Sequence, residues 1–330
     1  MLPSIPVRII STIAADALTL NPVTKRWFVF VPTVLFPVTL FYDAPFGRFS
    51  DLQSLFAIDG IKGWITMEIV APISFLITAF FIHPFSPNPL PLPSLSSPIP
   101  DPQTLLASLY LVHYLNRALI SPLRTPSRSP SHPAVVFFAL LFNIPNGFLL
   151  ASYLSSTSTA AFLTNAYASP RFWVGFLLWG VGFAGNIMHD DILLDIRRRA
   201  RKGKAKATEH TPPGEHYAIP HGLLYKYVSF PNYLSEWVEW LGYALAASPA
   251  PALSLLPPAQ VLLTALAGRN WSEARALLVP FADSVSPPWA FLMAEVLTMV
   301  PRAVRGHRWY KQRFGEAYPK GRWAVIPGLI

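Results

Sequence analysis

The stretch that decides the fold is Tyr217-Ala-Ile-Pro-His-Gly222, which runs on through Asn232-Tyr-Leu-Ser-Glu236 to Glu239-Trp240. It places an amide, two carboxylates and several aromatic side chains between apolar segments. The chain ends on a second polar and aromatic cluster, His307-Arg-Trp-Tyr310 followed by Tyr318-Pro-Lys320. Because polar groups at membrane depth are costly, they usually serve a function. The two clusters therefore predict a membrane-embedded site for a polar ligand.

The composition is that of an integral membrane protein. Of the 330 residues, 52% are hydrophobic and 13% are charged, whereas soluble domains carry about 25% charged residues. The net charge of +9 does not favour a nucleic-acid partner, because the basic residues form short runs between apolar segments, as in cytosolic membrane loops. The absence of cysteine excludes disulfides, thiolate zinc sites, iron–sulfur clusters and a cysteine nucleophile.

We predict an all-α membrane protein with about seven transmembrane helices, since each span needs about 20 mostly apolar residues. The candidate spans are 27–44, 63–83, 103–121, 134–155, 171–195, 233–250 and 287–304. They predict one membrane-embedded domain over 1–330.

Charge in the loops predicts the orientation. The loops at 122–133 and 196–216 and the tail from Arg302 are basic, whereas the loops at 84–102 and 156–170 contain no Lys or Arg. Because basic loops stay in the cytosol, the C-terminus is predicted to be cytosolic and the N-terminus lumenal.

Three segments depart from this simple pattern. Lys25 and Arg26 lie on the side predicted to be lumenal and oppose the orientation. The proline-studded loop at 84–102 predicts an extended, polyproline-like connector. The segment 251–286 is predicted to be an insertion, in which the apolar run 252–267, broken by Pro257-Pro258, forms a re-entrant or interfacial piece.

Two motifs lie in the span at 171–195. Gly180-Val-Gly-Phe-Ala-Gly185 has the letters of a dinucleotide-binding turn, but no strand precedes it, so close helix packing is favoured. Asn186, Asp190 and Arg197 recur at helical spacing on one face. A wetted helix end and a His189-Asp190-Asp191 metal site remain alternatives for this stretch.

Two other spans also carry polar side chains. Trp64-Ile-Thr-Met-Glu68 places a carboxylate in the second span, and His113-Tyr-Leu-Asn-Arg117 places several polar groups in the third. Helix-packing hydrogen bonds would explain either patch alone, but the presence of both favours a shared cavity.

Together these residues resemble the steroid 5α-reductase (3-oxo-5α-steroid 4-dehydrogenase) family from about Trp64 to Ile330. The matching islands are Val112-His-Tyr-Leu-Asn-Arg117, Pro170-Arg-Phe172, Asn186 through Asp190, Tyr217 to Tyr243, Arg302-Ala303, His307-Arg-Trp-Tyr310, and Tyr318-Pro-Lys320 through Ile326-Pro327. Residues 1–62 match weakly. The insertion at 251–286 and the longer basic loop at 198–216 depart from the family, and Arg305-Gly306-His307 replaces a more histidine-rich run.

The resemblance implies an oxidoreductase of lipid and steroid metabolism, a multi-pass protein of the endoplasmic reticulum membrane that uses NADPH to reduce the Δ4 double bond of a 3-oxo steroid. It assigns Glu68 and Tyr114 to catalysis at the substrate ketone, beside Trp64. The residues that it assigns to the cofactor pocket are Asn186, Asp190, Arg197, Tyr217, Asn232, Glu236, Arg302, His307 and Tyr310. No metal and no nucleic acid is expected, the substrate is a steroid or isoprenoid-like lipid, and the protein is expected to be a monomer.

The assigned residue types suit this chemistry. Hydride addition to the enone leaves negative charge on the ketone oxygen, and a preorganised donor such as the Tyr114 hydroxyl stabilises that charge by roughly 3–4 kcal/mol. Guanidinium groups match phosphate geometry, which favours NADPH over NADH. Polyprenol reductases and trans-2-enoyl-CoA reductases of the same membrane fold remain alternatives, as does a transporter or sterol sensor that binds no NADPH.

Overall fold

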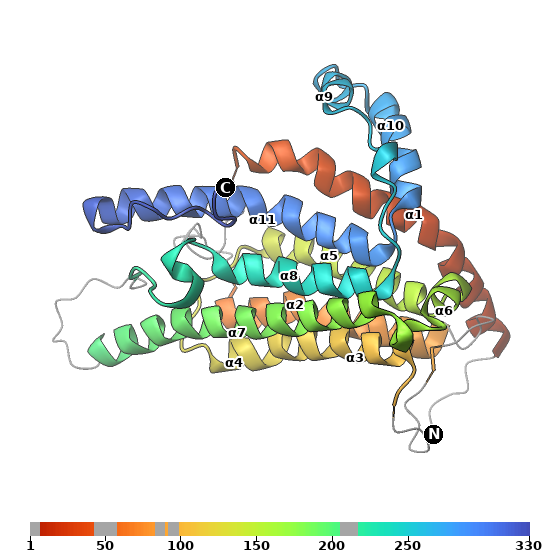
Figure 1. The fold of residues 1–330 in the computed structure, drawn as a ribbon, viewed down its shortest axis with the longest axis horizontal. Coiled ribbons are helices and arrows are strands. Elements are labelled where there is room, and N and C mark those ends of the chain that lie inside the picture. Colours follow the sequence, from red (N-terminus) through yellow and green to blue (C-terminus); the bar gives the residue numbers. More distant parts are fainter. Residues whose placement is uncertain (1–6, 43–57, 83–89, 92–98, 205–216) are drawn as a thin grey trace.

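The computed structural model describes residues 7–42, 58–82, 90–91, 99–204 and 217–330, which form a bundle of helices (Figure 1). The longer helices are α1 (Val7–Thr39), α2 (Gly60–Ile77), α3 (Pro102–Leu115), α5 (Pro133–Leu154), α7 (Pro170–Lys204), α8 (Pro231–Ala247), α10 (Trp271–Ser284) and α11 (Pro287–Phe314). Shorter ones are the π-helical turns η2 (Thr78–Ile82) and η4 (Asn116–Ile120), then α4 (Ser121–Arg124), α6 (Thr157–Leu163) and α9 (Ala259–Ala267). Within the described ranges the only β pairing is two isolated bridges.

Each predicted span falls on a helix, so the helical part of the prediction is confirmed. Three helices are longer than predicted, among them α11, which continues to Phe314 rather than ending at 304. Helix α1 begins at Val7 and contains Pro22, Pro32 and Pro37. Helix α7 continues to Lys204, into the segment predicted as a loop from 196, because its basic residues favour a helix and the first glycine there is Gly203. The rest of that predicted loop, 205–216, lies outside the described residues, as does most of the connector at 84–102.

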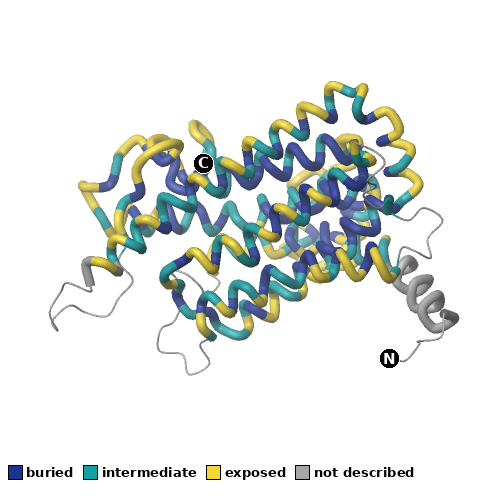
Figure 2. Tube along the Cα trace, turned by 90° about the horizontal axis from the view of Figure 1, so that it is seen from below, coloured by how far each residue is buried: buried dark blue, intermediate teal, exposed yellow. Residues whose placement is uncertain are grey.

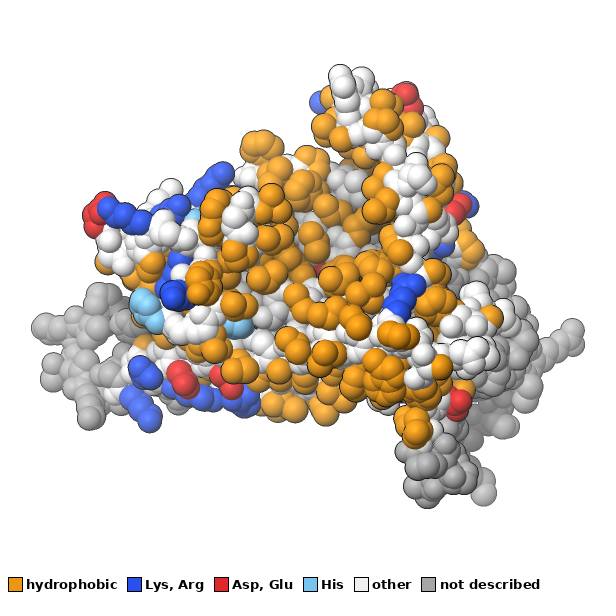
Figure 3. All heavy atoms as spheres, in the orientation of Figure 1, with side chains coloured by type: hydrophobic (Ala, Val, Ile, Leu, Met, Phe, Trp, Pro, Cys, Tyr) orange, Lys and Arg blue, Asp and Glu red, His pale blue; other side chains and the backbone are white. Residues whose placement is uncertain are grey.

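Three helical segments in the described part of the chain are long and apolar enough to cross a bilayer: Gly60–Ile82, Pro133–Leu154 and Pro170–Ala200. Large apolar side chains face outward from them, including Phe138, Leu177 and Val181. Figure 3 shows hydrophobic side chains across the middle of one face, with most of the Lys and Arg near the end where α7 and α11 finish. Such an apolar exterior is expected of a surface that contacts lipid.

Glycines allow helices α7 and α8 to pack closely against each other. A Cβ atom on Gly182 would lie 2.3 Å from the backbone nitrogen of Glu239, and one on Gly242 would lie 2.4 Å from the backbone nitrogen of Trp179. The helix-packing interpretation of the glycine motif is therefore confirmed at Gly182. Gly180 is different, because its Cβ position has no atom within 4 Å.

An aromatic core fills the bundle between these helices. Tyr110 stacks on Phe75 with ring centroids 4.6 Å apart, and Trp240 meets Phe291 edge to face at 4.5 Å. Figure 2 shows the buried residues where the helices face one another. Because this core packs α2, α3, α8 and α11 together, it fixes the positions of the polar side chains on the same helices.

The insertion predicted at 251–286 is helical. Helices α9 and α10 project from the bundle between the end of α8 and the start of α11 (Figure 1). Helix α10 packs against α1, and Arg26 of α1 forms a bidentate ion pair with Asp283 of α10.

Candidate functional site

A polar cluster lies inside the bundle, and we call it the polar core. It draws side chains from α2, α3, η4, α5, α7 and α8. Its members are Glu68, His113, Tyr114, Arg117, Asn146, Asn186, Asp190, Asn232, Glu236 and Glu239. Helical spacing explains its make-up, since Asn232, Glu236 and Glu239 lie on one face of α8, as Asn186 and Asp190 do on α7.

Arg117 links two carboxylates from different helices. Its Nε lies 3.3 Å from Glu68 Oε1, and its Nη1 lies 3.0 Å from Glu236 Oε1. Both carboxylates are buried, Glu236 with only 2% of its surface exposed. A buried charge is costly unless it is paired, so Arg117 holds α2 and α8 in a defined relation to α3.

Glu239 has a separate partner. Its Oε1 lies 2.7 Å from Nδ1 of His113, and neither residue has appreciable contact with solvent. The His113 ring also meets Trp240 at 4.7 Å. This pair joins α3 to α8 close to α7, where Gly182 packs against Glu239 and the Phe183 ring lies 6.4 Å from that of His113, and its closed surroundings indicate a positioning role.

The two residues assigned to catalysis have different partners. The Tyr114 hydroxyl accepts a hydrogen bond of 2.7 Å from the Asn146 side-chain amide, which leaves the hydroxyl's own hydrogen unused by this contact. Glu68 pairs with Arg117, which follows Tyr114 by one helical turn. The Trp64 ring lies close by, with its indole nitrogen donating to the Arg117 carbonyl at 3.1 Å.

Helix α7 and the first two turns of α8 are joined by four residues assigned to the cofactor pocket. Asn186 donates to the Asn232 carbonyl at 3.1 Å and to Glu236 Oε2 at 3.3 Å. The Asn232 amide donates in turn to Asp190 Oδ1 at 3.1 Å. The side-chain oxygen of Asn232 is buried and has no hydrogen-bond partner within the described part of the chain. This oxygen can therefore accept a hydrogen bond from a ligand.

Guanidinium groups approach this end of the polar core. Arg117, Arg128 and Arg197 all lie close enough to Asp190 for their charges to interact with it. Arg128 lies outside the helices, with its guanidinium 3.7 Å from the Trp64 ring centroid. Burial lowers the pKa of Arg128 to about 10, and the neighbouring Arg197 adds to this effect. Cations held this close together favour an anion between them.

The remaining assigned residues form a second group, which we call the tail cluster. The Ser229 hydroxyl lies 2.6 Å from His307 Nδ1 and 2.6 Å from the Tyr318 hydroxyl, and Tyr310 stacks on Tyr318 at 5.5 Å. Burial lowers the pKa of His307 to about 4, with Lys311 and Arg322 acting in the same direction.

Tyr217 and Arg302 lie at the margin of the tail cluster. Tyr217 meets Trp309 edge to face at 4.8 Å, and Arg302 is half-buried on α11. The predicted cofactor residues therefore divide into two groups. Phe230, which packs on Tyr310 and directly precedes α8, connects them.

Sequence reasoning placed Arg117 in the polar patch of the third span without giving it a role of its own, and it gave no site role to Arg128, Asn146 or Glu295. Glu295 is buried on α11, and its charge interacts with that of Glu236. Asn146 and Glu295 are isolated polar residues within apolar spans, and this is a signal that marks functional positions in membranes. No group of three or more His, Asp or Glu side chains able to hold a metal ion is found in the described ranges.

Comparison with known proteins identifies the family. The family model described as 3-oxo-5-alpha-steroid 4-dehydrogenase matches residues 130–282 and 277–330. The chain belongs to this family. It is 37% identical to the uncharacterized protein C9.08c of Schizosaccharomyces pombe over 90% of this chain and 94% of that protein. It is 31% identical to steroid 5-alpha-reductase DET2 of Solanum lycopersicum over 91% of this chain and 94% of that protein.

Similarity extends beyond the part matched by the family model. The bovine 3-oxo-5-alpha-steroid 4-dehydrogenase 1 is 28% identical over 87% of this chain and 88% of its own length. The resemblance first seen in the sequence is therefore confirmed. Within the family match lie α7, α8, α11 and Asn146, whereas Glu68 and Tyr114 precede it.

Proposed function

We propose that this chain is a membrane reductase that uses NADPH to saturate the Δ4 double bond of a 3-oxo steroid, giving the 5α-reduced product. The observation that carries the proposal is the pairing in the polar core, where Asn146 holds the Tyr114 hydroxyl and Arg117 holds Glu68. The relatives named steroid 5-alpha-reductase and 3-oxo-5-alpha-steroid 4-dehydrogenase support this substrate class.

Tyr114 is the proposed donor to the ketone oxygen. As negative charge develops on that oxygen, a hydroxyl held in place stabilises it by roughly 3–4 kcal/mol. Because the Asn146 amide donates to the Tyr114 oxygen, it fixes the hydroxyl without using the hydrogen that the ketone needs. Glu68, fixed by Arg117, is proposed to bind the same end of the substrate.

The polar core also fits a nicotinamide cofactor, which supplies the hydride when bound. Asn186, Asn232 and Glu236 offer both donors and acceptors, and the unpaired Asn232 oxygen suits the donors of a carboxamide or a ribose. Arg197 and Arg128 supply guanidinium groups for phosphate. We propose that Tyr217, Arg302, His307 and Tyr310 line the part of the pocket next to the tail cluster.

The proposed setting is the endoplasmic reticulum membrane, crossed seven times by a monomer with its C-terminus in the cytosol. Support comes from the helices found at the predicted spans, three of which are long and apolar enough to cross a bilayer. Further support comes from the Lys and Arg cluster near the ends of α7 and α11 (Figure 3). NADPH would then enter from the side that carries Arg197.

The test is turnover by the purified chain in detergent with NADPH and progesterone, with products read by mass spectrometry. We expect an NADPH-dependent gain of two hydrogens at the ring double bond. Tyr114→Phe and Glu68→Gln should each abolish most turnover. Tyr243→Phe is the matched control and should keep full turnover, because Tyr243 is a buried tyrosine whose hydroxyl has no hydrogen-bond partner in the described part of the chain.

The possible failures have different meanings. Full activity in both Tyr114→Phe and Glu68→Gln would refute the residue assignment. NADPH binding without steroid reduction would move the substrate to polyprenols or enoyl-CoA thioesters. If NADPH does not bind, the chain is not a reductase of this kind, and a transporter or sterol sensor becomes the better explanation.

A further inference from the structure

The insertion at 251–286, which contains α9 and α10, exposes large apolar side chains. Leu253, Leu263 and Trp271 are 64%, 58% and 52% exposed. Helix α10 runs roughly perpendicular to α7 and α8 (Figure 1). If α7 and α8 cross the bilayer, α10 therefore lies roughly parallel to its surface. Amphipathic helices in that orientation bury their apolar side chains in the bilayer interface. The insertion leaves the bundle opposite the Arg-rich end of α7, at the proposed lumenal surface.

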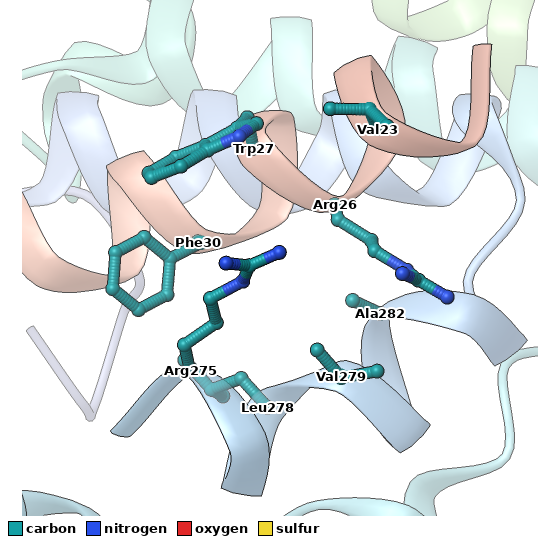
Figure 4. Close-up of a pocket in the computed structure, with 8 residues that line it drawn as sticks. All are labelled: Val23, Arg26, Trp27, Phe30, Arg275, Leu278, Val279 and Ala282. Atoms are coloured by element: carbon teal, nitrogen blue, oxygen red, sulfur yellow. The ribbon is translucent and has the colours of Figure 1, made fainter. Parts of the chain in front are cut away.

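A groove runs between α1 and α10 (Figure 4), with apolar walls from both helices. The residues that line it are Val23, Arg26, Trp27, Phe30, Arg275, Leu278, Val279 and Ala282. Apart from two guanidinium groups, the lining is hydrocarbon and aromatic ring, which suits an acyl chain better than a polar metabolite.

Positive charge is in excess beside this groove. Arg26 pairs with Asp283 through two hydrogen bonds of 2.7 Å, and Lys25 donates to the Asp283 backbone carbonyl at 3.0 Å. No carboxylate in the described part of the chain forms an ion pair with Arg275, whose guanidinium lies 6.0 Å from the Trp27 ring centroid. Three cations therefore face one carboxylate, and the exposed Arg275 is available to an anion.

We propose that this groove binds one acidic phospholipid, whose phosphate pairs with Arg275 and whose acyl chain lies along the apolar walls. Guanidinium forks match phosphate oxygens, and a phospholipid carries in one molecule both a phosphate to pair with Arg275 and a hydrocarbon chain that suits the apolar walls. The site is distinct from the polar core and does not depend on which lipid the enzyme reduces.

Native mass spectrometry of the full chain in detergent tests the proposal, with dioleoylphosphatidylglycerol, dioleoylphosphatidylcholine and inorganic phosphate as probes. We expect the phosphatidylglycerol adduct to form preferentially. Arg275→Gln should weaken it about tenfold, as expected for one charge-assisted contact, and Arg275→Lys should weaken it less. Arg269→Gln is the matched control, because Arg269 is an exposed cation of the same insertion that does not line the groove.

Thermal unfolding of each variant without lipid shows whether the fold is intact. Equal weakening by Arg275→Gln and Arg269→Gln would overturn the proposal, because general charge would then explain binding. So would equal binding of the two phospholipids. Displacement of phosphatidylglycerol by inorganic phosphate at similar concentration would replace the lipid site with a simple phosphate site.

Discussion

Substitution of Gly182 by alanine should separate α7 from α8 and disable the polar core. The added Cβ would lie 2.3 Å from Glu239 N, 2.6 Å from Glu239 Cα and 2.6 Å from the Ser235 carbonyl oxygen. Non-bonded heavy atoms are usually about 3.5–4.0 Å apart, so α8 must retreat by roughly 1 Å. All three atoms are backbone atoms, so a side-chain rotation cannot relieve the overlap.

The cost has two parts. Overpacking of this kind destabilises a protein by about 1–3 kcal/mol. The displacement also moves Glu236, whose carboxylate lies 3.0 Å from Arg117, out of hydrogen-bond range. A misplacement of about 1 Å in a catalytic site costs roughly 100-fold in rate. We therefore expect Gly182→Ala to lower both the melting temperature and the turnover of progesterone.

Gly180→Ala provides the control on the same helix. Its Cβ position has no atom within 4 Å, and alanine is favoured over glycine in a helix by about 1 kcal/mol. This variant should be as stable as the parent or more so, with unchanged turnover. Thermal unfolding in detergent and steady-state kinetics measure both effects. If the two variants behave alike, close packing at Gly182 does not position the site, and the reasoning is refuted.

Three further predictions concern charge. Arg117→Gln leaves its two carboxylate partners unpaired and should destabilise the protein by about 3–5 kcal/mol, with partial rescue in Arg117→Lys; unchanged thermal unfolding would contradict this. The pKa of His307 is about 4 in the folded chain and about 6.5 when unfolded, so stability should be full above pH 6.5 and fall as the pH drops, by about 1 kcal/mol at pH 5 once solvent screening of the imidazole is included. His307→Gln should remove this pH dependence, whereas His221→Gln, at an exposed position, should keep it. Arg197→Gln should raise KM for NADPH about tenfold and leave KM for NADH unchanged, and an equal rise for both would place Arg197 away from the 2′-phosphate.

Residues on a single helix were the easiest part of the site to predict. The spacing of Asn186 and Asp190 placed them on one face of α7, and both meet the first turn of α8 as that face requires. Asn232 and Glu236 likewise share a face of α8. Periodicity fixes which side chains point together because the geometry of one helix is nearly invariant.

The contacts between different helices could not be predicted from the spacing of residues along one helix. Helical spacing places Tyr114 and Arg117 on one side of α3 and η4. It does not predict that Asn146 hydrogen-bonds to Tyr114, or that Glu68 and Glu236 both pair with Arg117. Those partners depend on how α2, α5 and α8 pack around α3. The division of the cofactor residues into a polar core and a tail cluster has the same origin, because it follows from the path of the chain through Phe230.

The insertion provides Lys25 and Arg26, the two cations that oppose the predicted orientation, with a shared partner in Asp283. Basic residues near a span favour the cytosol because an unpaired cation is costly to translocate. In the structure Asp283 neutralises Arg26 and accepts a hydrogen bond from Lys25 through its carbonyl. The proposed phospholipid would compensate the charge that remains on Arg275. A charge count along the sequence weighs these cations as if they had no partner, whereas the fold supplies an acid from a segment more than 250 residues later.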